Sequence, residues 1–155
     1  MARHVQDVDV VVVDGSRWPL VHSKYPKRIE DGDVFLQTFR QGIETVLGMR
    51  PNQLFLHLAD LSQTENTVNA KSRRRMAEML TELEEEFGKP IADCVVVRSR
   101  ALQLIGTGVT FLQGSLRYTR KFFSDLDEGE RWLLSRAEDA GLSFPLSTPA
   151  RASAS

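Results

Sequence analysis

The feature that most constrains this chain is the alternation of short, continuous apolar segments with longer amphipathic ones. Residues 54–59 and 91–97 are dense in apolar side chains, which is typical of strands covered on both faces. Over residues 67–87 and 100–113, apolar side chains recur every three or four positions, the spacing of a helix packed by one face. Buried strands that alternate with helices of this length predict a mostly parallel sheet.

The N-terminal part adds a hairpin and the C-terminal part a last strand and helix. A β-branched run at 8–13, a turn at Asp14-Gly15-Ser16 and a return at 18–23 predict two antiparallel strands. The remaining elements are a helix from Asp31 to Gly48, a strand at 120–124 and a helix ending at Gly141. The expected order is β-β-α-β-α-β-α-β-α in one α/β domain over residues 1–141. Residues 142–155 are expected to form a flexible tail, because their small and polar side chains bury little area.

Composition and charge exclude several classes of protein. The chain has 155 residues, with 20 Lys plus Arg against 21 Asp plus Glu, so its net charge of -1 gives no general attraction to nucleic acid. No apolar stretch approaches the roughly 20 residues that span a bilayer, and the apolar run at 10–13 is too short for a signal-peptide core. We therefore expect no membrane span and a cytoplasmic location.

The single cysteine, Cys94, falls in a predicted buried strand, where a thiol acts as a small apolar group.

The residue types that carry catalysis or bind metals are scattered. His4, His22 and His57 lie in separate elements, without the spacing of a metal site. Gly106-Thr-Gly108 lacks the third glycine of a dinucleotide-binding loop, and no Gly-x-Ser-x-Gly motif is present. We expect no metal, no cofactor and no catalytic residue. An enzyme whose site is assembled from distant strand ends, with Asp60 and Arg98 as members, stays open.

Charge is segregated along the helix expected at 67–87. Arg73, Arg74 and Arg75 lie near its start and four glutamates of 82–86 near its end. Helix dipoles favour acids in the first turn and bases in the last, so this order is the reverse of the stabilising one. The helix therefore presents either a plain solvated face or a surface patterned for a partner.

Four segments carry a resemblance to a known family. They are Trp18-Pro-Leu-Val, Leu54-Phe-Leu-His-Leu-Ala-Asp60, Ala92-Asp-Cys-Val-Val-Val-Arg-Ser99 and Phe122-Phe-Ser-Asp-Leu-Asp-Glu-Gly-Glu-Arg-Trp-Leu133. Together they resemble the SpoIIAA-like branch of the bacterial STAS domains, over nearly the whole chain. The resemblance implies a small cytoplasmic α/β domain that binds a protein partner rather than catalysing a reaction.

The same resemblance directs attention to the end of the third strand. In the anti-sigma-factor antagonists of the family, this strand ends in Asp followed by a phosphorylated hydroxyl residue. Asp60 matches, but Leu61 stands at the phosphoacceptor position and Ser62 comes one residue later. Ser62 is thus the local candidate for a switch, and Ser62 or Asn66 is also a candidate N-cap for the next helix.

The candidate partner-binding or switch residues are Asp60, Ser62, Asn66, Arg73, Arg74 and Arg75. The partner would be another protein or a second copy of the chain, contacting the helix at 67–87 and the loop from Asp60 to Asn66. The alternative is a carrier of a small molecule or lipid, with an apolar pocket bordered by the hairpin and residues 106–111. Such a carrier needs a cavity of roughly 300 Å³ or more. The small residues around Gly106 also suggest close approach of that helix to the sheet or to another chain.

Overall fold

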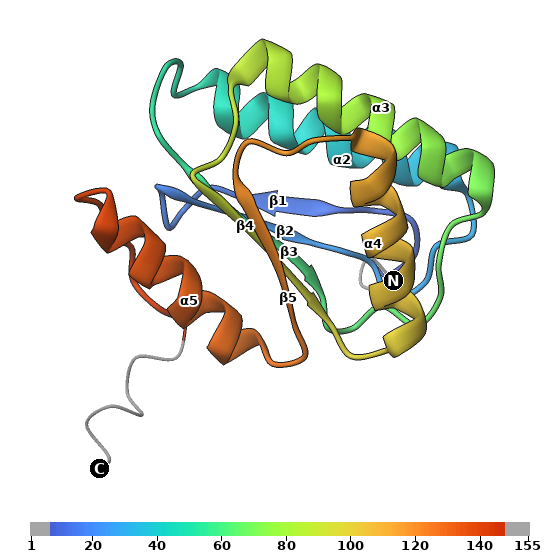
Figure 1. Ribbon diagram of the computed structural model, residues 1–155. Coiled ribbons are helices and arrows are strands. Elements are labelled where there is room, and N and C mark those ends of the chain that lie inside the picture. Colours follow the sequence, from blue (N-terminus) through green and yellow to red (C-terminus); the bar gives the residue numbers. More distant parts are fainter. Residues whose placement is uncertain (1–6, 148–155) are drawn as a thin grey trace.

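The computed structural model describes residues 7–147, and its centre is one five-stranded sheet with the spatial order β1-β2-β3-β4-β5 (Figure 1). The strands are β1 (Val12–Asp14), β2 (Leu20–Lys24), β3 (Leu56–Leu61), β4 (Ala92–Val97) and β5 (Thr119–Phe123). The first two strands pair antiparallel, and every later neighbour pairs in parallel. The predicted α/β class, hairpin and element order are confirmed, and the hairpin's first strand forms one edge of the sheet.

Three helices cover one face of the sheet and the fourth covers the other. The helices are α2 (Gly32–Gly48), α3 (Ala70–Phe87), α4 (Arg100–Gln113) and α5 (Leu126–Asp139). Figure 1 shows α2 and α3 side by side above the sheet and α5 on its opposite side. Helices α2, α3 and α4 each connect two neighbouring parallel strands, and right-handed crossovers place all three on the same face.

The alternation of side chains along each strand separates two apolar cores. Val21 and Ala59 face the α2 and α3 side, where they meet Phe35, Phe39 and Leu83. The second core lies on the α5 side of the sheet, and the residues at its centre are all buried. They are Leu20, Leu56, Leu58, Ala92, Cys94 and Val96, packed against Leu133, Ala137 and Phe144. The burial expected for Cys94 is therefore confirmed.

Side-chain caps begin the helices. Asp31 accepts hydrogen bonds from the backbone N–H groups of Asp33 and Val34 at the start of α2, as the sequence predicts. The α3 cap is Asn69, which accepts from the N–H of Ser72. The prediction of Ser62 or Asn66 as this cap is wrong, because the chain continues as a loop to residue 69 before it turns helical.

The packed domain extends past residue 141, its predicted end. Phe144 is 4% exposed and Leu142 and Leu146 pack against the same α5-side core. Ser147 donates hydrogen bonds to the buried Glu130 through its N–H and hydroxyl. Apolar side chains spaced by polar ones are enough to hold this segment, which composition alone assigned to a tail. The remainder of that tail, 148–155, lies outside the described residues.

Two glycines of α4 differ in what surrounds them. A Cβ added at Gly106 would come within 2.7 Å of the Phe122 ring on β5, so glycine is needed there for the helix to approach the sheet. This confirms the close approach to the sheet proposed for that helix. A Cβ added at Gly108 would meet nothing within 4 Å. The fold of this chain therefore does not require a glycine at 108.

Candidate functional site

A row of polar side chains crosses the sheet under the helices, one from each of four strands. Residues 57, 93 and 120 are register partners on β3, β4 and β5. His57 Nδ1 donates to Asp93 Oδ1 at 2.9 Å, and Arg120 Nε donates to Asp93 Oδ2 at 2.6 Å. On β2, Ser23 Oγ lies 2.8 Å from His57 Nε2, and the hydroxyl donates a hydrogen bond to this nitrogen when the imidazole is neutral.

This polar row joins the sheet to the helices. The guanidinium of Arg120 also donates to Thr110 and Gln113 of α4 and to the Tyr118 hydroxyl, which in turn donates to Glu84 of α3. Among the described residues, every buried side-chain nitrogen and oxygen has a hydrogen-bond partner. A fully satisfied buried network makes the packing specific. The row therefore fixes how α3 and α4 sit on the sheet.

The Ser23-His57-Asp93 order matches the chemical order of a hydrolase triad, but the serine is inaccessible. Ser23 is 0% exposed and does not line the cavity that borders His57 and Asp93. A nucleophile must reach the substrate, so these three groups serve the fold in this structure. The partners of His57 could not be predicted from the sequence, since only the strand register shows which positions are adjacent.

The cavity beside the polar row is small. Its volume is about 100 Å³, and its walls include Tyr25 after β2 and both Gly106 and Val109 of α4. Gly106 and Val109 border this cavity, as expected for a carrier, but no residue of the hairpin at 8–23 lines it, and its volume is a third of the roughly 300 Å³ that such a carrier needs. Phe111, also expected at its border, is 83% exposed and points away.

A second polar cluster lies on the α5 side of the sheet, near the carboxyl ends of β2 and β3. Arg17 pairs with the buried Glu130 of α5 through both carboxylate oxygens, at 3.0 and 3.3 Å. The same guanidinium donates to His22 Nδ1, and His22 Nε2 donates to Asp60 Oδ2 at 3.0 Å. The other Asp60 oxygen accepts the Ser62 hydroxyl at 2.6 Å. Asp60 is therefore held in a chain of hydrogen bonds that anchors α5.

We expect acid to destabilise the protein because three buried carboxyls have lowered pKa values. Burial alone would raise the pKa of each carboxyl, but its hydrogen-bond and charge partners lower the pKa by more. These partners are His22 and Ser62 for Asp60, Arg120 and His57 for Asp93, and Arg17 and Ser147 for Glu130. A carboxyl with a lowered pKa stabilises the fold above its unfolded value of about 4, and this contribution is lost as the pH falls through the folded pKa.

Urea unfolding at pH 7, 5, 4 and 3 measures this effect. The free energy of unfolding should change little from pH 7 to 5 and then fall steadily toward pH 3. Glu130→Gln, which removes one of the three titrating groups, should make the fall between pH 5 and 3 shallower. Equal stability at pH 5 and pH 3 in the unmodified chain would contradict the assignment.

The structure divides the predicted partner-binding residues between the two sides of the sheet. Asp60 and Ser62 lie together on the α5 side, whereas the arginines lie on α3. Asn66 holds the loop in place by accepting from the N–H of Ile29 and donating to its carbonyl. Asp60 and Ser62 therefore lie on a different side of the sheet from the three arginines, with which they were expected to share a surface.

The pair considered for an enzyme is not brought into a common cleft. Asp60 is 4% exposed, and its two carboxylate oxygens accept hydrogen bonds from His22 and Ser62. Arg98 is exposed beyond the end of β4. Neither residue lines the cavity next to the polar row. This placement counts against an active site built on Asp60 and Arg98.

The three arginines of α3 have different roles. Arg73 donates to the carbonyl of Val68 at 2.8 Å and so helps to hold the start of the helix. Arg75 pairs with Asp33 of α2 at 2.6 Å, on an exposed surface. Arg74 is exposed and forms no ion pair with any other described residue. Of the three arginines, Arg74 is the one with neither a side-chain hydrogen bond nor an ion pair to another described residue.

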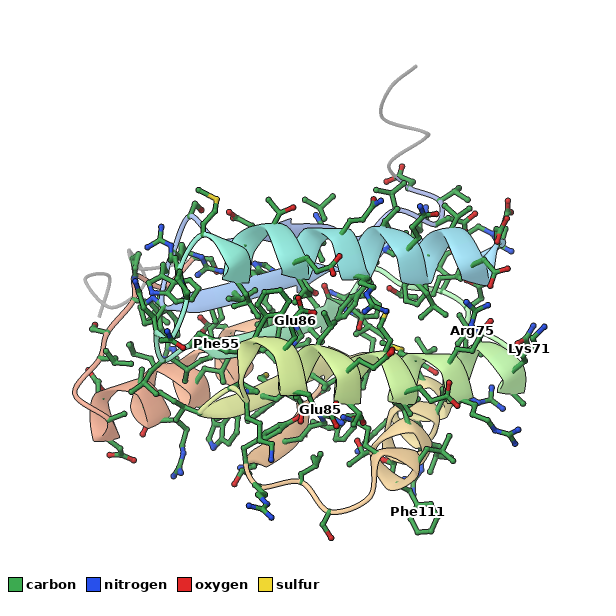
Figure 2. The ribbon with its side chains drawn as sticks, turned by 90° about the horizontal axis from the view of Figure 1, so that it is seen from above. Phe55, Lys71, Arg75, Glu85, Glu86 and Phe111 are labelled. Atoms are coloured by element: carbon green, nitrogen blue, oxygen red, sulfur yellow. The ribbon has the colours of Figure 1, made fainter. Side chains whose placement is uncertain are left out.

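The outer face of α3 carries a continuous stripe of charge. Its exposed members, spaced three or four residues apart, are Lys71, Arg74, Arg75, Glu78, Glu82, Glu85 and Glu86, which we call the α3 stripe. Figure 2 shows Lys71 and Arg75 toward one end of the helix and Glu85 and Glu86 toward the other. The stripe is therefore positive over the first turns and negative over the last.

A groove runs between α2 and α3 next to this stripe. It encloses about 560 Å³ and is lined by charged, polar and apolar side chains of both helices. These residues are Asp33, Leu36, Gln37, Arg40, Arg75, Glu78, Met79 and Glu82. Ion pairs between Arg75 and Asp33 and between Arg40 and Glu82 cross it at 2.6 and 3.5 Å. Arg75, Glu78 and Glu82 belong to both the groove and the stripe, so the two form one continuous surface.

The described residues contain neither a metal-binding cluster nor a membrane-spanning helix. Within residues 7–147, no three side chains of the metal-binding types converge. None of the helices in that range combines the length and apolar character needed to cross a bilayer. In comparison with known proteins, the chain matches no family model, no curated protein and no solved structure.

Proposed function

We propose that this chain is a non-enzymatic, cytoplasmic regulatory module that binds a protein partner through the α3 stripe and the groove beside it. The observation that carries the proposal is the segregation of charge along the exposed face of α3. The resemblance to STAS domains, whose members act by binding proteins, supports the same class of function.

Folding does not explain the charge pattern. The first turn of α3 has no acidic residue and its last turn no basic one, so the helix dipole disfavours both ends of the stripe. Glu78 and Glu82, and likewise Glu82 and Glu86, are like charges at i,i+4 spacing, which destabilise a helix by a few tenths of a kcal/mol per pair. A pattern that costs the helix stability is understandable when the charges serve an interaction.

The pattern also specifies the partner's chemistry. Lys71, Arg74, Glu78, Glu85 and Glu86 form no ion pairs with other described residues, so their charges are available. A partner segment that is acidic where it meets Lys71 and Arg74, and basic where it meets the glutamates, would complement the stripe in one direction only. Such complementarity speeds association and selects orientation more than it adds affinity.

Charge reversal at the two free cations tests the proposal. Lys71→Glu with Arg74→Glu leaves Arg73 and Arg75, which hold structural contacts, in place. The matched control, Arg131→Glu with Arg136→Glu, makes the same change of charge on α5, at two exposed positions on the opposite side of the sheet. All three proteins should give the same circular dichroism spectrum, since surface charges contribute little to stability.

The measurement is quantitative capture of proteins from a lysate of the native host at low and high salt. We expect a defined set of proteins to be captured by the unmodified chain and the α5 control, and at least about tenfold less by the α3 variant, which corresponds to about 1.4 kcal/mol. Raised salt should weaken the capture, because exposed charges are screened. If the α3 variant captures the same proteins in the same amounts, the proposal fails.

A further inference from the structure

Helix α4 presents an apolar face to solvent. Leu104 is 64% exposed, Phe111 83% and Leu112 51%, and Ala101 and Gly108 are exposed between them. Figure 2 shows Phe111 projecting outward from α4, away from the rest of the domain. These five residues, spaced as on one side of a helix that packs against another, are called the α4 face below.

The opposite side of α4 attaches the helix to its own domain. Leu102 and Val109 are buried there, and Gly106 lies against Phe122. Most of the α4 face is therefore left out of the packing of the described chain. From residue 101 to residue 113 the helix has no charged side chain. A partner helix with charges at this contact would leave them desolvated and unpaired, so the α4 face favours an equally uncharged surface.

We propose that the α4 face binds the α4 face of a second copy of the chain, with the two helices antiparallel and the two-fold axis passing close to Gly108. A two-fold contact must be self-complementary. About this axis, Leu104 of each copy faces Leu112 of the other, and Gly108 faces Gly108. Phe111 then packs over the turn that contains residues 104 and 105 of the second copy.

Gly108 is the residue that the chain alone does not explain. Glycine lowers helix stability relative to alanine, and no described atom lies where its Cβ would be. In the antiparallel pair its missing side chain lets the two backbones approach closely, which brings the leucines on either side into contact. The cost to the helix is thus offset by the contact between copies.

Charge at the ends of α4 favours the antiparallel arrangement. Arg98 and Arg100 lie at the N-terminal end of the helix, where the dipole is positive and disfavours cations. In the pair, each copy's arginines lie beside the C-terminus of the other α4. The free carbonyls at that C-terminus carry partial negative charge, and the last turn of α4 contains no basic residue. A parallel pair would place the four guanidinium groups together.

One helix pair buries less than the roughly 1,200–2,000 Å² of a stable interface, so the dimer should dissociate on dilution. Sedimentation velocity from about 1 µM to about 300 µM is the test, since that range covers weak dimers. We expect the unmodified chain to pass from monomer to dimer over it. Phe111→Glu should raise the dissociation constant at least tenfold, whereas Met49→Glu, at an equally exposed apolar position, should leave it unchanged.

Gly108→Ala separates the proposal from a general loss of stability. We expect this variant to melt at a higher temperature than the unmodified chain when both are dilute and monomeric, and to dimerise at least tenfold more weakly. A monomer at every concentration would overturn the proposal. So would a dimer that neither Phe111→Glu nor Gly108→Ala weakens, because its interface would then lie elsewhere.

Discussion

Replacing Asp93 by alanine is expected to lower the free energy of unfolding by about 3–5 kcal/mol, the range found when one partner of a buried ion pair is removed. The carboxylate is 6% exposed and accepts from both His57 and Arg120, whose own side chain is 7% exposed. Without it, a guanidinium stays buried with no counter-charge and a histidine loses the acceptor that orients it. Urea unfolding measured at pH 7 gives the size of the loss.

The control for Asp93 is Asp33→Ala, which removes a carboxylate paired to an arginine over the same 2.6 Å. Asp33 and Arg75 are 75% and 52% exposed, so we expect a loss of at most about 1 kcal/mol. Equal losses for the two variants would show that burial does not determine the strength of these pairs. Asp93→Leu combined with Arg120→Met should cost less than the sum of the single changes, with a coupling of about 0.5–3 kcal/mol.

Replacing Phe39 by alanine is the second change with a large expected effect, a loss of about 3–5 kcal/mol in the free energy of unfolding. Phe39 is 1% exposed on α2, with its ring centroid 5.9 Å from that of Tyr25 and 6.2 Å from that of His57, both edge-on. It also forms part of the wall of the cavity. Removing the ring enlarges this space, so the cost of a larger cavity adds to the loss of buried apolar area.

Met49→Ala serves as the comparison for Phe39, because Met49 is 76% exposed just after α2. Its replacement should change the free energy of unfolding by no more than about 0.5 kcal/mol. If Phe39→Ala lowered the free energy of unfolding by no more than this, the neighbouring side chains would have to move into the space left by the ring. The core on the α2 side would then be less rigidly packed than the structure indicates.

The elements of this fold could be predicted because their signals are local. The continuous apolar runs around Leu56 and Cys94 are long enough to identify buried strands, and the helix at residues 100–113 has the predicted bounds. Asp31 acts as the predicted cap because an N-cap needs only residues within one turn. The start of α3 was misplaced since Ser62, Asn66 and Asn69 can all cap a helix, and only the path of the loop selects among them.

The candidate site could be predicted only in part. The charged stripe of α3 was visible in the sequence, because helical spacing decides which of its residues share a face. That Asp60 and Ser62 lie on the other side of the sheet was not visible, although alternation along β3 is the physical cause: Ala59 faces α3 and Asp60 faces α5.

The sequence by itself therefore determined the class of fold, the order of its elements and the segregation of charge along α3, since each depends on residues close together in the chain. Only the tertiary structure decided that His57, Asp93 and Arg120 form one buried row, that the α3 cap is Asn69, and that the α4 face is left exposed. These features depend on strand register and on which helix faces find a partner. Both are set by the packing of distant segments, for which a single sequence has no local signal.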